Sequence, residues 1–180
     1  MSSYEKAALL LQSRRFDEAA REARSALTSD PANLAAYEIA IVAEIELKNY
    51  AEAEGLLKSA MKLVPDEPHL HYLYGRLWYL QNKNSRAEEY IREAISLNPN
   101  EAEYFGMLAA IQLEKQEYNA AVKIAEDGLA VDPENLTCLN IRSSALTKLG
   151  RKAEAFETAD AALSKDPENT MSHMVSGYNQ

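Results

Sequence analysis

The sequence predicts an all-α protein, an α-solenoid of antiparallel helix pairs, and three observations lead to this prediction. Five of the six prolines follow one another at intervals of 34 residues: Pro31, Pro65, Pro99, Pro133 and Pro167. Small residues repeat with the same period. Within each period, apolar residues recur at three- and four-residue steps, which is the spacing of an amphipathic helix. A helix pair of this length cannot bury its own apolar face, so successive pairs must stack.

The small residues occupy two columns of the repeat. The first column contains Ala19, Ala53, Ala87, Ala121 and Ala155, and the second contains Ala26, Ala60, Ala94, Gly128 and Ala162. Where two helices cross closely, a side chain larger than alanine would hold the helix axes apart. We therefore expect replacement of Ala87 by leucine to destabilise the fold by about 1–3 kcal/mol.

Each repeat contains two helices joined by a short polar turn. In the second repeat, Leu34, Tyr37, Ile41 and Ile45 form the apolar face of the first helix, and Ala53, Leu57, Ala60 and Met61 form that of the second. The turns between paired helices are expected at Ser13-Arg14-Arg15, Lys48-Asn49, Asn82-Lys83-Asn84, Lys115-Gln116-Glu117 and Gly150-Arg151-Lys152. The periodic prolines end the second helices because proline lacks an amide donor and restricts the residue before it.

Capping residues mark the starts of the first helices. Asparagines follow the prolines closely and are expected N-caps, at Asn33, Asn135 and Asn169. The sixth proline, Pro68, suits the first turn of a helix. Ser2 and Glu5 have the spacing of a capping box, so the first helix is expected to begin almost at residue 1.

Composition excludes several classes of protein. The chain has 180 residues, 26% of them charged, and a formal net charge of −9, which disfavours binding to nucleic acid or an anionic membrane. Its single cysteine, Cys138, excludes an internal disulfide and a cysteine zinc site. No apolar run resembles a signal peptide or a membrane span. We expect a cytoplasmic protein, or a periplasmic or membrane-tethered one if the chain is a fragment.

These motifs resemble the tetratricopeptide repeat (TPR) family over essentially the whole chain. The third repeat supplies Tyr74-Gly75 and Trp78, the fourth supplies Phe105, Leu108-Ala109 and Tyr118, and Phe16 and Tyr50 fill the aromatic position near the turn. The second and fifth repeats depart from the pattern, with Ala40-Ile41, Glu44 and Arg142-Ser143. The resemblance implies one right-handed superhelix over residues 1–180, with repeats at about 1–33, 34–67, 68–101, 102–135 and 136–169 and a partial repeat at 170–180.

In this family the first helices line a concave groove that binds peptides. The resemblance places ten candidate groove residues here: Tyr4, Leu11, Glu38, Val42, Ile45, Tyr72, Arg76, Tyr79, Leu113 and Asn140. Tyrosines beside carboxylates suit an extended or helical peptide. The alternative interpretation is that Tyr4, Tyr72 and Tyr79 only complete the packing between repeats.

One specialised ligand of the family is not expected. Repeats that bind the carboxy-terminal tail of chaperones use a clamp of Lys, Asn and Arg side chains, because a terminal carboxylate needs cationic donors. The corresponding positions here hold Tyr4, Ala8, Ile39, His69 and Leu73. The sequence therefore predicts no chaperone-tail carboxylate clamp.

No catalytic, metal or cofactor site is predicted. His69 and His71 are two residues apart on a helix and point in different directions, which disfavours zinc binding. Cys138 lies among Leu136, Leu139 and Ile141 and is interpreted as a buried structural thiol. Runs of Glu and Asp are interpreted as solvated helix faces.

The carboxy terminus predicts a truncated sixth repeat. Residues 170–180 suffice for one first helix, whose apolar face holds Met171, Met174, Val175 and Tyr178. A terminal helix should be polar there, so we expect a piece of a longer array that can self-associate through this helix.

The predicted function is a non-enzymatic scaffold that binds a peptide or protein segment in its groove. Two alternatives remain open at this point. One is an accessory TPR arm of a larger enzyme such as a glycosyltransferase, and the other is a structural component of an envelope or secretion assembly. Both depend on analogy with the family.

Overall fold

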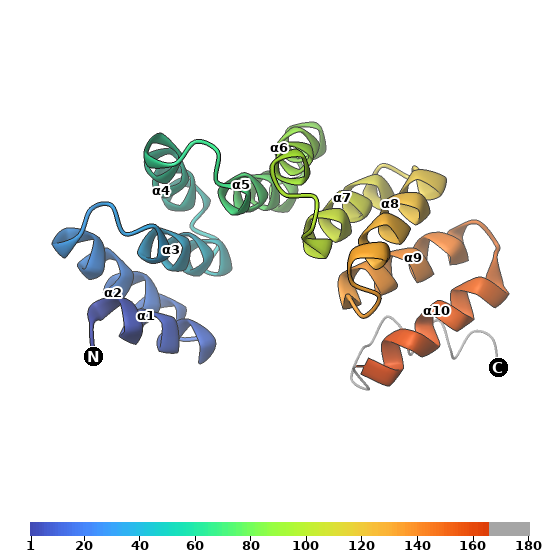
Figure 1. Ribbon diagram of the computed structural model, residues 1–180, viewed down its shortest axis with the longest axis horizontal. Coiled ribbons are helices and arrows are strands. Elements are labelled where there is room, and N and C mark those ends of the chain that lie inside the picture. The colour runs from blue at the N-terminus through green and yellow to red at the C-terminus, as the bar shows by residue number, and fades with distance from the viewer. Residues whose placement is uncertain (166–180) are drawn as a thin grey trace. The chain divides into compact units, whose positions relative to one another are not determined.

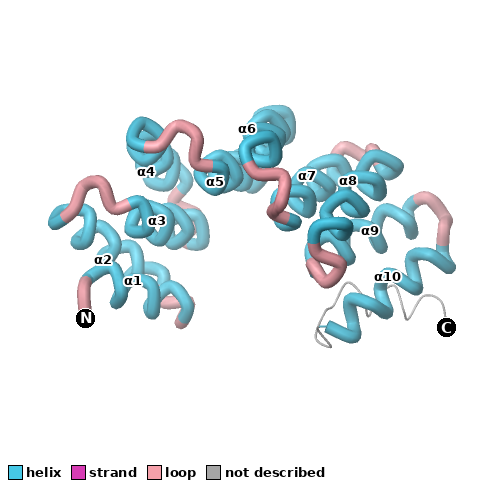
Figure 2. Tube along the Cα trace, viewed as in Figure 1, coloured by secondary structure: helices cyan, strands magenta, loops and turns pink. Residues whose placement is uncertain are grey.

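The computed structural model describes residues 1–165, and the only regular secondary structure in this part of the chain is α-helix, as predicted (Figures 1 and 2). Its helices are α1 (Ser3–Gln12), α2 (Phe16–Ser29), α3 (Leu34–Glu46), α4 (Tyr50–Leu63), α5 (Pro68–Leu80), α6 (Asn84–Leu97), α7 (Ala102–Glu114), α8 (Tyr118–Val131), α9 (Leu136–Lys148) and α10 (Lys152–Lys165). The odd-numbered helices are the first helices of the repeats and the even-numbered helices are the second. The predicted sixth repeat and the cap at Asn169 lie outside the described residues.

The chain divides into two compact units, unit 1 (Met1–Lys83) and unit 2 (Asn84–Gln180). Unit 1 contains α1 to α5 and unit 2 contains α6 to α10. The boundary falls between the two helices of the third repeat. The single continuous array expected from the sequence stays a prediction.

Within each unit, successive first helices approach one another more closely than successive second helices do. In unit 1, α3 contacts both α1 and α5, whereas α2 and α4 each pack on α3. In unit 2, α7 contacts α9, and α8 packs on both. This difference follows from the solenoid arrangement, in which second helices are held apart by the first helix between them. It leaves clefts between successive second helices.

The turns inside the repeats share one backbone conformation. Five residues at intervals of 34 have positive φ values between 58° and 77°: Arg14, Lys48, Asn82, Gln116 and Gly150. In the second repeat, the Lys48 amide donates to the Ile45 carbonyl oxygen at 2.9 Å and the Asn49 amide donates to Glu44 at 2.8 Å. This pair of bonds is a Schellman motif, which satisfies the last carbonyl groups of a helix. Glycine adopts this conformation with the least strain, and among the five positions only that of the fifth repeat, Gly150, is a glycine.

The helix starts and ends agree with the predicted caps. The side chains of Asn33 and Asn135 accept hydrogen bonds from the amides of Ala36 and Cys138, at 3.1 and 2.9 Å. The Ser2 hydroxyl accepts from the Glu5 amide at 3.2 Å. Pro68 is the first residue of α5, and α2, α4, α6 and α8 each end two residues before a periodic proline. These predictions are confirmed.

The core consists of alanine columns with aliphatic residues between them. The alanines of the first small column are all buried, with at most 1% of their surface exposed. In the second column, Gly128 replaces alanine, and a Cβ atom there would lie 2.5 Å from the sulfur of Cys138 and 2.9 Å from Cβ of Phe105. The crossing of α8 with the neighbouring first helices is therefore too close for any side chain.

Among the helices of residues 1–165, none has both the length and the apolar character that a membrane crossing requires.

Candidate functional site

Eight of the ten candidate groove residues lie in unit 1, on α1, α3 and α5. We call the solvent-accessible side of these helices the first-helix face of unit 1, formed by Tyr4, Leu11, Glu38, Val42, Arg76 and Tyr79. Tyr4 is exposed and the others are partly buried. Leu11 also packs against the core cluster of α1, α2 and α3. The face therefore combines apolar and charged side chains that remain in reach of a ligand.

Two candidates on the same helices are buried. Ile45 has 2% of its surface exposed and Tyr72 has 9%. Ile45 belongs to the core of α3, and the ring of Tyr72 stacks on His69, with ring centroids 5.3 Å apart. These two side chains pack beneath the first-helix face, in the interior, and present little surface to a ligand.

An ion pair joins two helices of this face. The Arg76 Nη2 atom donates to the Glu46 Oε1 atom at 2.8 Å, which links α5 to α3. About a quarter to a third of each side chain is exposed, 27% for Arg76 and 30% for Glu46. A pair held between two helices keeps both charges in a defined place, although solvent screening limits its contribution to stability.

Glu38 adds a carboxyl group with an altered pKa. The pKa of Glu38 is raised above its ordinary value, first because the carboxyl group is partly buried and second because Glu67 repels its charge. Glu67 is the N-cap residue of α5, so the repulsion acts between α3 and the start of α5. A carboxyl group that gains a proton more readily than usual accommodates an apolar neighbour, whereas a basic neighbour would favour its charged form.

The two histidines of α5 have separate local partners. His69 stacks on Tyr72, whereas Nε2 of His71 lies 2.8 Å from the carbonyl oxygen of Pro65. Residues 1–165 contain no group of three or more His, Cys, Asp or Glu side chains placed to hold a metal ion.

The remaining candidates, Leu113 on α7 and Asn140 on α9, lie in unit 2 and are partly buried. Leu113 packs against the apolar cluster of α8, α9 and α10. On the same helices, Glu103 accepts hydrogen bonds from the Asn135 side-chain amide at 3.1 Å and from the Thr137 hydroxyl at 2.9 Å. These hydrogen bonds connect α7 to the start of α9.

Cys138 is a structural thiol, as the sequence predicts. It is fully buried, its sulfur lies 3.5 Å from the carbonyl oxygen of Ala102, and it packs in a small cluster with Ala109 and Ala125. The pKa of Cys138 is raised to about 12, first by burial and then by the charges of nearby carboxylates. A thiol with this pKa is not a nucleophile at neutral pH.

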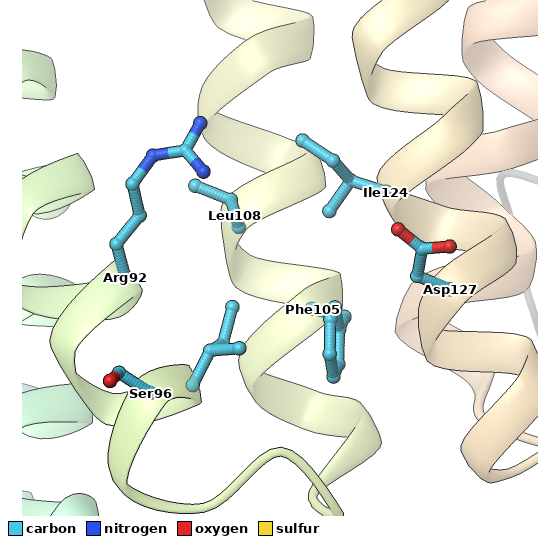
Figure 3. A pocket seen from close by; sticks show the side chains of 7 residues that line it. Arg92, Ser96, Phe105, Leu108, Ile124 and Asp127 are labelled. Carbon is cyan, nitrogen blue, oxygen red and sulfur yellow. The ribbon is translucent and has the colours of Figure 1, made fainter.

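The structure also contains two clefts that were not predicted from the sequence. One, of about 270 Å³, lies between α6 and α8 over α7 and is lined by Arg92, Ile95, Ser96, Phe105, Leu108, Ile124 and Asp127 (Figure 3). The other, of about 390 Å³, lies between α2 and α4 and is lined by Arg24, Ala51, Glu52, Gly55, Leu56 and Ser59. Three lining pairs (Arg24 and Arg92, Leu56 and Ile124, Ser59 and Asp127) are 68 residues apart, which is two repeats. This 68-residue spacing was the signal in the sequence from which the two clefts could have been found.

Solved structures resemble this chain in fold. The pilF protein of Pseudomonas aeruginosa has a TM-score of 0.84 at 19% identity, over 96% of this chain and 79% of that one. TTC0263, a thermophilic TPR protein of Thermus thermophilus, has a TM-score of 0.83 at 16% identity, over 97% and 96%. YrrB, described as a TPR protein with an unusual peptide-binding site, has a TM-score of 0.67 at 18% identity, over 97% and 90%.

Sequence comparison also finds one curated relative. A Dictyostelium discoideum protein described as "DnaJ homolog subfamily C member 7 homolog" is 27% identical over an alignment of 139 residues, which covers 68% of this chain. This chain spans about a quarter of that relative, 26% of its length. Two family models described as "Tetratricopeptide repeat" match residues 44–111 and residues 4–68 and 107–170. The chain therefore belongs to the tetratricopeptide repeat family.

Proposed function

We propose that this chain is a non-catalytic scaffold that binds a peptide or protein segment on the first-helix face of unit 1. The TPR fold is consistent with a protein–protein interaction scaffold, and proteins of this fold are generally non-catalytic. The observation that carries the proposal is the Arg76–Glu46 ion pair, which lies among partly exposed apolar side chains on adjoining first helices. A structural neighbour, YrrB, has a peptide-binding site, which supports the same class of ligand.

The face suits a segment that is apolar with one or two charges. Leu11, Val42 and Tyr79 supply apolar surface from three successive first helices, so a ligand crossing these helices meets each in turn. Arg76 and Glu46 supply charges of opposite sign at a defined place. Because the helices pack on a buried core, the backbone of the face is already formed before binding, which favours affinity.

Site-specific photocrosslinking tests this proposal. A benzophenone amino acid placed at Val42 or Tyr79 should capture a protein partner in lysate of the native source. The same amino acid at Lys58 or Ser59, which are exposed on α4 of the same unit, should not capture it. Mass spectrometry then identifies the crosslinked peptide. Capture of the same partner only from Lys58 and Ser59 would reject the first-helix face as its binding surface.

A second candidate is a structural role in an envelope or secretion assembly. PilW, a structural neighbour described as a widely conserved type IV pilus biogenesis factor, matches this chain with a TM-score of 0.80 at 17% identity. This identity supports a shared fold only. Crosslinked partners drawn from the cell envelope would favour this candidate, whereas partners from the cytosol would favour a general scaffold or an arm of a larger enzyme.

A further inference from the structure

The cleft between α6 and α8 combines an apolar floor with charged edges. Its floor is formed by Ile95 of α6, Phe105 and Leu108 of α7, and Ile124 of α8. Arg92 lies on the α6 side and Asp127 on the α8 side, with α7 between them (Figure 3). The two charged residues of opposite sign therefore stand on opposite sides of an apolar depression.

The charges beside this cleft are held on their own helices. Arg92 donates from Nε and Nη2 to the Glu88 carboxylate, one turn earlier on α6, at 3.0 and 2.8 Å. Asp127 accepts from Lys123, one turn earlier on α8. More than half of the Arg92 side chain, 56%, and 43% of that of Asp127 are exposed. Both groups therefore remain able to meet a ligand, and neither closes the cleft.

In the equivalent cleft of unit 1, which has a volume of about 390 Å³, an arginine pairs with carboxylates of other helices. There Arg24 reaches from α2 to Glu52 of α4 at 3.1 Å, and also to the buried Glu44 of α3 at 3.4 Å. Two repeats later the positions of Glu44 and Glu52 hold Gln112 and Ala120. With no acid at these two positions, Arg92 pairs with Glu88 on its own helix and does not cross the cleft.

We propose that the α6–α8 cleft binds one large apolar side chain of a partner protein, flanked on that partner by one acidic and one basic residue. A volume of about 270 Å³ lies below the range of about 300–1,000 Å³ of small-molecule pockets and suits a single side chain. The acidic group pairs with Arg92 and the basic group pairs with Asp127. This site lies between two second helices of unit 2, over the first helix α7, and does not depend on the function proposed above.

Designed helical peptides provide the probe. Three peptides carry a central leucine with a charged residue one helical turn before it and another one turn after it. The two charged residues are Glu and Lys in the first peptide, two Glu in the second and two Lys in the third. A fourth peptide is the Glu/Lys peptide with alanine in place of leucine. Methyl NMR signals of Ile95, Leu108 and Ile124 report binding. We expect the Glu/Lys peptide to bind about threefold more tightly than the like-charged ones. Removal of the leucine should weaken binding about tenfold or more.

Three variants of the protein distinguish specific binding in this cleft from non-specific binding. Ser96→Phe, at an exposed edge position, should fill the cleft and abolish the methyl shifts, whereas Thr28→Phe at the equivalent place in unit 1 should leave them unchanged. Asp127→Lys should transfer the preference to the peptide with two Glu residues. Because that peptide carries the same charge on both sides of its leucine, this preference does not depend on the direction in which the peptide lies. Circular dichroism verifies that each variant is folded.

Three results would overturn the proposal. They are the absence of methyl shifts in the cleft, equal binding of all three charged peptides, and binding that survives Ser96→Phe. None of these results concerns Val42 or Tyr79, so the crosslinking experiment tests the proposed function of unit 1 independently.

Discussion

The segments α2–α3–α4 and α6–α7–α8 lie two repeats apart and carry an arginine at the same place, Arg24 and Arg92. Arg24 crosses to carboxylates of α3 and α4, whereas Arg92 stays on its own helix with Glu88. The difference arises from the surrounding residues. Equivalent backbone positions in a repeat protein therefore do not guarantee equivalent surfaces, because each side chain takes the nearest partner of opposite charge.

The same two segments also differ in how closely their helices cross. Ala60 near the end of α4 corresponds to Gly128 near the end of α8. The sulfur of Cys138 and the side chain of Phe105 occupy the space of a Cβ atom at Gly128. A buried thiol in one repeat is thus accommodated by the loss of a methyl group in the repeat before it.

The largest expected effect follows from Gly128→Ala. The added methyl group would overpack the contact with Cys138 by about 1–3 kcal/mol, more than the roughly 1 kcal/mol that alanine gains in helix propensity. Urea denaturation should therefore show a net loss of stability. Cys138→Ala in the same protein should recover part of it, because the clash is removed. Strict additivity of the two substitutions would contradict this account.

A smaller effect is expected from Glu44→Gln in unit 1. Glu44 is buried and accepts hydrogen bonds from Arg24 and from the Asn49 side chain, the latter at 2.8 Å. Loss of its charge should lower the free energy of unfolding by about 1 kcal/mol. Glu52→Gln is the matched control, because that carboxylate is 65% exposed and should contribute little. Equal losses from both variants would show that burial of Glu44 is irrelevant.

In contrast to the destabilising substitutions above, glycine placed in the turns should increase stability. Lys48→Gly and Gln116→Gly place glycine where φ is 62° and 63°, and we expect each to raise the melting temperature, with a gain of about 0.5–1 kcal/mol. Asn82→Gly should gain less, because asparagine tolerates this conformation. Gly150→Ala, with φ of 77°, should lose stability. Destabilisation by Lys48→Gly would mean that the lysine side chain contributes more than backbone strain removes.

The smallest effects concern pH and have opposite signs in the two units. The pKa of Glu38 is raised, first by burial and then by Glu67, so the folded state prefers its protonated form. Its contribution to stability falls as pH rises through the window above its ordinary pKa of 4.5. Glu38→Gln should therefore increase stability at neutral pH, and the gain should disappear in acid.

Glu88 provides the opposite case in unit 2. Burial alone would raise the pKa of Glu88, but hydrogen bonds and charges from Lys115 and Arg92 outweigh burial and lower it. Its contribution is present above pH 4.5 and is lost as pH falls through the lowered pKa. Glu88→Gln should weaken the fold at neutral pH and have no effect in strong acid. Thermal unfolding of both variants between about pH 3 and 7 checks the two signs.

Local structure was the part of the molecule best predicted from the sequence. The caps at Asn33 and Asn135, the first turn at Pro68 and the polar turns between paired helices are confirmed. These features depend on contacts between residues a few positions apart, and a 34-residue period repeats each of them. The buried thiol of Cys138 was also predicted correctly from its apolar neighbours along the helix.

The candidate site was harder to predict. Helical position places Ile45 and Tyr72 beside Val42 and Arg76, yet the first two are buried and the second two are partly exposed. The clefts between second helices were not predicted because they are lined by residues of more than one helix. Exposure of a side chain depends on the size of residues one repeat away, which no local pattern contains.

For this protein, periodicity and capping chemistry in the chain itself determined the helices, their ends and their order, since those depend on backbone bonding within a few residues. The folded arrangement decided which arginine crosses between helices, which small residue had to be glycine and where an open apolar cleft remains. The reason is that packing and charge pairing act over distances in space, between side chains separated by tens of residues along the chain.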